Sequence, residues 1–162
     1  MGDVTVEFVD GDGDGDIVGW ALADGPRPAG RGVAHANGVT EIDHVVMVTP
    51  RLERTTAELE EAGIELRRIR EGETGMGPYR QAFFRVGRPI LEVVESPDMS
   101  DDDPPRFWGV TFTTADIDAA AELLADGLGR IKDAVQPGRR IATVRKEAGL
   151  GLPVALISPK PG

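Results

Sequence analysis

Apolar and polar residues alternate with a two-residue period over residues 41–49, EIDHVVMVT. This period predicts a β-strand with two unlike faces. One face is expected to carry His44 with Ile42, Val46 and Val48, and the other Val45 and Met47.

A helix and three more strands are predicted after this strand. Thr49 can cap the helix, Pro50 suits its first position and Gly63 can end it. The helical spacing i, i+4 and i+7 is seen at Leu52, Thr56 and Leu59. Strands are then predicted at 64–70, 80–87 and 89–96, with a glycine-rich loop over 71–79.

The same order restarts after an acidic, proline-bounded linker at 98–106. WGVTFTT, residues 108–114, predicts a strand, and either Thr113 or Thr114 can cap the next helix. That helix repeats the first one 65 residues later, with Ile117, Ala121 and Leu124 in place of Leu52, Thr56 and Leu59. Three more strands are predicted at 130–136, 139–145 and 153–159.

Two further matches indicate an internal duplication. The third strands share the pattern R-x-A-x-x-R, and the last strands align as LEVV and VALI. The pattern is carried by Arg80, Ala82 and Arg85 in one copy and by Arg140, Ala142 and Arg145 in the other. We therefore predict an α+β fold with two tandem βαβββ modules, at 41–97 and 107–162. Residues 1–40 are expected to form an N-terminal β-hairpin and a Gly/Pro-rich linker.

Composition narrows the possible functions. The 162 residues include 40% hydrophobic residues, no cysteine and two histidines, which excludes thiolate chemistry. A net charge of −10 argues against nucleic-acid binding, because phosphate contacts need a basic surface. No apolar run approaches the roughly 20 residues of a membrane-spanning helix, and residues 1–10 do not resemble a secretory signal. The expectation is a cytoplasmic protein that contacts neither nucleic acid nor membrane.

The tandem modules, with I-D-H-V-V opening the first and I-L-E-V-V-E closing it, resemble the vicinal oxygen chelate superfamily. That superfamily includes glyoxalase I, extradiol dioxygenases, methylmalonyl-CoA epimerases and bleomycin-resistance proteins. The resemblance covers about residues 41–159. It implies a cupped mixed sheet around a cleft, a small-molecule ligand and, because such sheets often pair, a homodimer.

The resemblance also implies four positions for the ligands of a divalent metal, on the first and last strands of each module. In the first module these are His44 and Glu92; in the second they are Gly109 and Ala155, which cannot coordinate through side chains. A mononuclear Fe, Mn, Ni or Zn site wants at least three protein ligands. Metal binding by His44 and Glu92 would therefore need a third group, such as His35 if the linker folded over the cleft.

Two interpretations of this pair remain open: a metal-dependent lyase, isomerase or dioxygenase, or a metal-free acid–base couple. Arg80 and Arg140, at matched places, are candidate substrate-binding residues together with Gln81, and two arginines suit an anionic ligand. Two further alternatives are a sequestering protein of the bleomycin-resistance type with a degenerate metal site, and a regulatory or scaffold module.

Overall fold

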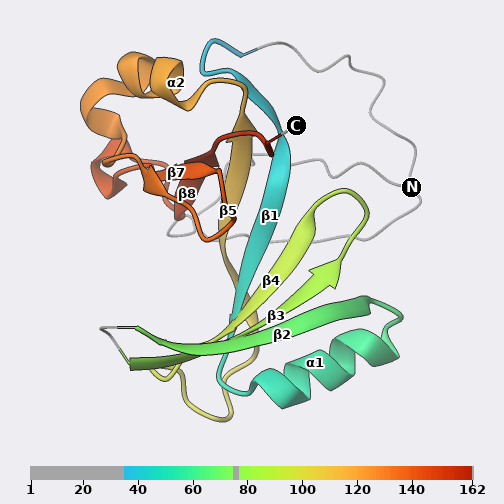
Figure 1. The fold of residues 1–162 in the computed structure, drawn as a ribbon. Helices are drawn as coiled ribbons and strands as arrows, with labels where there is room; N and C mark the ends of the chain where they lie inside the picture. The colour runs from blue at the N-terminus through green and yellow to red at the C-terminus, as the bar shows by residue number, and fades with distance from the viewer. Residues whose placement is uncertain (1–34, 75–76, 162) are drawn as a thin grey trace.

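The structure is a computed structural model that describes residues 35–74 and 77–161. These residues form one eight-stranded mixed sheet with two α-helices, in the strand order β2-β3-β4-β1-β5-β8-β7-β6 (Figure 1). Apart from residues 35–40, the predicted N-terminal hairpin and linker lie outside the described residues. Neither α-helix in the described ranges is long and apolar enough to cross a membrane.

Each half of the sheet has the order strand, helix, three strands. The first module comprises β1 (Val39–Thr49), α1 (Leu52–Glu61), β2 (Glu65–Thr74), β3 (Gly77–Arg85) and β4 (Ile90–Glu95). The second comprises β5 (Arg106–Thr114), α2 (Ile117–Leu124), β6 (Lys132–Asp133), β7 (Arg140–Thr143) and β8 (Val154–Ile157), with 3₁₀ turns at Ala125–Gly127 and Lys146–Ala148. Strands β1 and β4 pair in parallel, as do β5 and β8, and antiparallel pairing of β1 with β5 joins the modules. The predicted tandem βαβββ fold is confirmed.

The strand registers show the duplication residue by residue. Val45 pairs with Leu91 in the first module, and Val110, 65 residues after Val45, pairs with Val154 in the second. The two fully buried alanines of the R-x-A-x-x-R patterns also match, because Ala82 pairs with Val93 and Ala142 pairs with Leu156. The four aligned positions 44, 92, 109 and 155 therefore hold equivalent places in the two modules.

One helix covers one side of each module and builds a separate core there (Figure 1). Leu52 of α1 packs with Phe84, Leu91 and Val93, while Ile117 of α2 packs in a second cluster. That second cluster also contains Ala120, Leu128, Ala142 and Leu156. A third cluster at the junction joins Val45, Val110 and Val154. Burial of these apolar side chains is the main force that holds each helix on the sheet.

The β1–β5 register shifts at three places, and two of these shifts are β-bulges at duplicated positions. Asp43 is an extra residue on β1, because Ile42 pairs with Phe112 and His44 pairs with Thr111. Trp108, 65 residues later, is the extra residue on β5, between the pairs Val46–Gly109 and Met47–Phe107. A bulge changes which face the following side chains take.

Because of the first bulge, Ile42 lies on a different face of the sheet from the one predicted. Ile42 packs with the cluster of Val45 and does not share the face of His44. Strict alternation was wrong here because the sequence gives no sign of the extra residue at Asp43.

The helix starts also differ from the prediction. Helix α1 begins at Leu52, whose N–H donates to the carboxylate of Glu95 at 3.0 Å, and Asp116 rather than Thr113 or Thr114 caps α2. Thr49 and Thr114 are fully buried at the strand ends. Their hydroxyls are used elsewhere: Thr49 hydrogen-bonds Thr55 Oγ1 at 2.7 Å, and Thr114 donates to the Asn37 carbonyl at 2.8 Å.

The predicted loop at 71–79 is mostly strand. Gly72 pairs with Tyr79 across β2 and β3, and a Cβ at residue 72 would lie 2.6 Å from the Tyr79 hydroxyl. The glycine therefore makes room for an aromatic ring, and the cross-strand packing outweighs its weak strand propensity.

We expect the matched core residues Leu52 and Ile117, each 1% exposed, to contribute similarly to stability. Leu52→Ala or Ile117→Ala should lower the free energy of unfolding by about 2–5 kcal/mol, through lost apolar burial and a residual cavity. Urea unfolding measures this. Leu123→Ala, at a side chain 53% exposed on α2, is the matched control and should change little. A loss below about 1 kcal/mol in either core variant would contradict the assigned packing.

Candidate functional site

Polar groups gather on the face of the sheet that is turned away from the two helices, which we call the inner face. Glu92 on β4 lies between Leu91 and Val93, both buried against α1, so its side chain points to the inner face. Its strand neighbour Val46 is two residues from His44 on β1, which places His44 on the same face.

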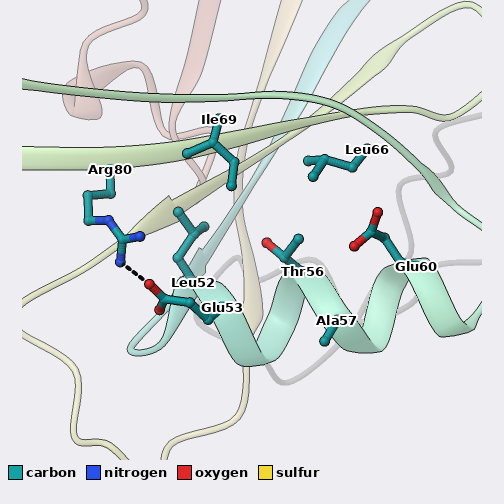
Figure 2. A pocket seen from close by; sticks show the side chains of 8 residues that line it. All are labelled: Leu52, Glu53, Thr56, Ala57, Glu60, Leu66, Ile69 and Arg80. Atoms are coloured by element: carbon teal, nitrogen blue, oxygen red, sulfur yellow. Dashed lines mark ion pairs between the residues drawn. The ribbon is translucent and has the colours of Figure 1, made fainter.

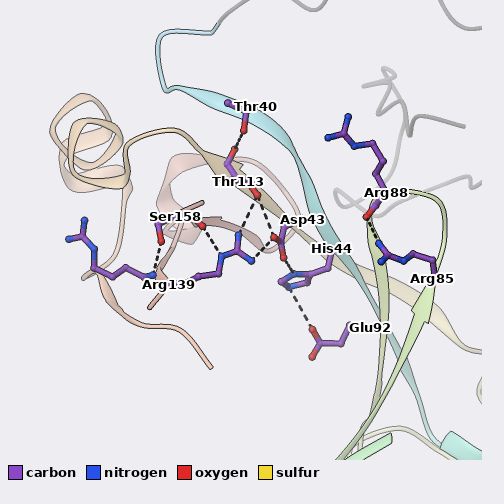
Figure 3. A network of polar contacts seen from close by, with 10 residues as sticks. Thr40, Asp43, His44, Arg85, Arg88, Glu92, Thr113, Arg139 and Ser158 are labelled. Carbon is purple, nitrogen blue, oxygen red and sulfur yellow. Dashed lines mark hydrogen bonds and ion pairs between the residues drawn. The ribbon is translucent and has the colours of Figure 1, made fainter. Parts of the chain in front are cut away.

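The structure brings His44 and Glu92 together. The imidazole Nε2 of His44 lies 3.6 Å from Glu92 Oε2, and the two side chains are 13% and 17% exposed (Figure 3). This separation allows an ion pair but is too long for a hydrogen bond. Catalytic pairs without substrate often have such long separations, which shorten when substrate binds.

Asp43 holds the other ring nitrogen of His44. Its Oδ1 lies 2.9 Å from His44 Nδ1. Burial alone would raise the pKa of Asp43, but hydrogen bonds from His44 and Arg139 and their charges lower it to about 2. Because an ionised carboxylate can only accept, Nδ1 carries a hydrogen, and in the neutral ring Nε2 presents its lone pair towards Glu92.

Arg139 links the second module to this site. Its side chain is 2% exposed, and its guanidinium lies 2.7 Å from Asp43 Oδ2 and donates from Nε to the Ser158 carbonyl at 2.8 Å (Figure 3). The hydroxyl of Thr113 also lies between Asp43 and Arg139, at 3.4 Å from each. The bulged Asp43 is therefore held from both modules.

The pKa of Glu92 is shifted in the opposite direction from that of Asp43. Burial raises its pKa above the ordinary value, the charge of Asp43 adds to this, and the charges of His44, Arg70 and Arg68 partly oppose it. A carboxyl group with a raised pKa beside an imidazole is suited to exchange a proton with it.

Two arginines of β2 lie on the inner face near Glu92. Arg68 pairs with Phe83, which in turn pairs with Glu92, and its guanidinium is stacked 4.7 Å from the centre of the Phe83 ring. Arg70 is stacked in the same way on Tyr79, at 5.4 Å, and pairs with Gln81. Gln81 is thus the one predicted substrate-binding residue that shares the face of Glu92.

Arg80 and Arg140 lie on the opposite face, beside the helices. Arg80 forms a 2.6 Å ion pair with Glu53 of α1 (Figure 2). Arg140 forms one of 2.6 Å with Asp118 of α2, 65 residues after Glu53. Arg80 also lines an apolar cavity of about 270 Å³ between α1 and strands β2 and β3. Neither arginine contacts His44 or Glu92 through any hydrogen bond or ion pair among the described residues, so their duplicated role is to tie strand to helix.

The donor set does not fit a mononuclear metal site. Gly109 and Ala155 occupy the second-module ligand positions and offer no side-chain donor, and no group of three potential ligands exists in the described ranges. His35, exposed and accepting from the Asn37 N–H at 3.3 Å, does not complete the set. His44 and Glu92 therefore supply two ligands, whereas a mononuclear site of this type needs at least three protein ligands.

Asp43 and Arg139 are the site residues that sequence reasoning missed. Alternation assigns Asp43 to the face opposite His44, and only the bulge brings it back. Arg139 aligns with Tyr79 of the first module and adjoins the candidate Arg140, so the repeat gave no reason to select it. The available signal was that the predicted strand at 139–145 begins with an arginine that has no matching arginine in the first module.

Comparisons with known proteins identify the family and the fold. The sequence profile of the Glyoxalase/Bleomycin resistance protein/Dioxygenase superfamily matches residues 41–146. No curated protein matches the chain.

Solved structures with the same fold include methylmalonyl-CoA epimerase from Mycobacterium tuberculosis, at 20% identity and a TM-score of 0.59 over 78% of this chain and 97% of that one. A methylmalonyl-CoA epimerase in complex with methylmalonyl-CoA and NH4+ is also 20% identical, with a TM-score of 0.58 over 75% and 96%. A hypothetical protein from Bacillus halodurans is 12% identical, with a TM-score of 0.58 over 75% and 96%.

At these identities the structures establish the fold, and the profile match establishes the family. The chain belongs to the glyoxalase/bleomycin resistance protein/dioxygenase superfamily.

Proposed function

We propose that this protein binds a small oxygenated anion on the inner face and moves a proton on it, using His44 and Glu92 as an acid–base couple. The observation that carries the proposal is the line Asp43–His44–Glu92. One carboxylate orients the imidazole at 2.9 Å, and a second carboxyl group with a raised pKa stands 3.6 Å from its other nitrogen.

The reaction class that suits this couple is proton transfer at a carbon next to a carbonyl group. One member takes the proton from the carbon and the other returns a proton to the carbon or to the enolate oxygen, so the ligand is isomerised without net gain or loss of atoms. Asp43 would stabilise the imidazolium that forms during transfer, because it is ionised and hydrogen-bonded to Nδ1. The epimerase names of two similar structures are consistent with this chemistry.

Members of the superfamily commonly use a divalent metal, which would polarise the ligand's oxygens. The residues here supply two of four ligand positions, so the proposed steps use protein groups only. The ligand's negative charge would be met by Arg68 and Arg70, whose charges act on Glu92 from β2. The stacking of both arginines on aromatic rings holds their guanidinium groups in place.

A second candidate is a binding protein without catalysis, of the sequestering type. The loss of donors at Gly109 and Ala155 favours it, since a site that only binds needs no metal ligands. The two candidates share the ligand site and differ in whether His44 and Glu92 transfer a proton, so a proton-exchange experiment separates them.

Proton transfer predicts that the protein accelerates the exchange of acidic C–H hydrogens with D2O. The probes are 2-oxobutanoate and methylmalonyl-CoA, and 1H NMR follows the loss of the signal. His44→Ala or Glu92→Gln should slow the catalysed exchange by about 10²–10⁴-fold, the usual contribution of a positioned acid or base. His35→Ala and Glu41→Gln, which alter the exposed histidine and an exposed glutamate, are the matched controls.

Binding of either probe without exchange would favour the sequestering protein.

Metal analysis of protein purified without chelator tests whether the site works without a metal. Near-stoichiometric Fe, Mn, Ni or Zn that disappears in His44→Ala would overturn the metal-free proposal.

The ligand site also predicts which arginines matter. Arg68→Gln or Arg70→Gln should weaken 2-oxobutanoate binding about tenfold or more, because each removes a charged hydrogen-bond donor. Arg80→Gln and Arg140→Gln change the arginines that pair with helix carboxylates and should leave affinity nearly unchanged. Calorimetric titration measures the affinities. The reverse ranking would support the anion site that the sequence pattern predicts and contradict the one proposed here.

A further inference from the structure

A small hollow of about 80 Å³ occupies the ligand position of the second module. Gly109 and Ala155 line it at the places that correspond to His44 and Glu92, and the bulged Trp108 lines it at the place of Asp43. Thr111 and Thr143 also line it. The first module therefore has charged side chains at these three positions. The second module has an aromatic ring and a small hollow at the equivalent positions.

The hollow adjoins the His44–Glu92 couple through strand pairing. Val46 lines the hollow and pairs with Glu92 on one side and with Gly109 on the other. Thr111, also in the lining, pairs directly with His44. A molecule bound at His44 and Glu92 therefore has the hollow within one strand spacing of its bound end, roughly 5 Å.

The chemistry of the hollow suits an uncharged group. None of the described side chains that line it carries a charge, and one of the lining residues is Trp108, which is 47% exposed. A Cβ at position 109 would meet the Pro153 carbonyl oxygen at 2.7 Å, so a ligating side chain cannot return there without a backbone shift. Thr111, a neutral residue that is 4% exposed, lies at the boundary with His44.

We propose that this hollow is a specificity subsite that takes a short alkyl substituent of the molecule whose reacting carbon lies at His44 and Glu92. The inference rests on the proposed function, which supplies the anionic end of that molecule. Size sets the substituent: a cavity of about 150 Å³ encloses benzene, so a space of about half that volume encloses a branched chain of a few carbons but not a phenyl ring.

A series of 2-oxo acids that differ in their substituent tests the subsite on the full chain. Pyruvate, 2-oxobutanoate and 3-methyl-2-oxobutanoate carry one, two and three carbons beyond the carbonyl, and phenylpyruvate carries a ring. The dissociation constant should fall about fourfold with each added carbon across the first three acids, because each buries about one more methyl or methylene group. Phenylpyruvate should bind more weakly than 3-methyl-2-oxobutanoate.

Trp108 provides the readout. The chain has two tryptophans, so in a Trp20→Phe background the fluorescence of Trp108 alone reports occupancy of the hollow. The longer acids should change this fluorescence more than pyruvate does.

Two variants change the hollow without touching the acid–base couple. Ala155→Leu fills it, so all three aliphatic acids should then bind with about the affinity of pyruvate. Trp108→Ala removes one wall at an exposed position and, read by calorimetry, should also flatten the series, which keeps the test open if Ala155→Leu fails to fold. Leu123→Ala, which truncates a similarly exposed side chain on α2, is the control and should preserve the series.

The outcomes test the alkyl subsite and the acid–base proposal separately. Graded binding that flattens in the variants supports the subsite, whether or not proton exchange is seen. Equal binding of all the acids overturns the subsite and leaves the acid–base proposal intact. If none of the four acids binds, both the anionic ligand and the role of the hollow are overturned.

Discussion

The ion pair between Asp43 and Arg139 is the contact on which the site depends. It joins a bulged residue of β1 to the residue that precedes β7 in the second module, at 2.7 Å and with the arginine almost fully buried. A buried guanidinium without its carboxylate would be strongly destabilising, so module docking and the orientation of Asp43 are coupled. Asp43 in turn fixes the hydrogen of His44 Nδ1 and turns Nε2 towards Glu92.

The two carboxyl groups that flank His44 respond oppositely to pH. Asp43 has a lowered pKa, so its stabilising contribution is complete above its ordinary value of 3.8 and is lost as the pH falls through about 2. Glu92 has a raised pKa, so the folded state holds its proton more tightly than the unfolded chain does. Its contribution is therefore complete at low pH and declines as the pH rises through the folded-state pKa. The loss of stability that Glu92 causes at higher pH therefore arises at a residue that we propose as a proton donor or acceptor.

The sequence predicted the fold well because duplication makes weak signals repeat. Leu52 and Ile117, Ala82 and Ala142, and the strands of Val45 and Val110 all hold equivalent places in the structure. Individual side chains were harder to assign to a face, because a bulge depends on how two strands pair. The sequence of one strand alone does not show where the extra residue lies. Alternation thus misplaced Ile42 and hid Asp43. The R-x-A-x-x-R pattern was real, but Arg80 and Arg140 repeat because each ties a strand to the first turn of its helix.

The acid–base couple of His44 and Glu92 can be tested by NMR of the His44 ring and the Glu92 carboxyl across pH, in protein labelled with 15N-histidine and 13C-glutamate. Variants His35→Ala and Glu92→Gln assign the signals. We expect neutral His44 to carry its hydrogen on Nδ1, and Glu92 to titrate above the ordinary glutamate value of 4.5 in a step that also shifts the Nε2 signal of His44. A hydrogen on Nε2 of the neutral ring, or a Glu92 carboxyl that titrates at or below the ordinary value without affecting His44, would contradict the acid–base couple.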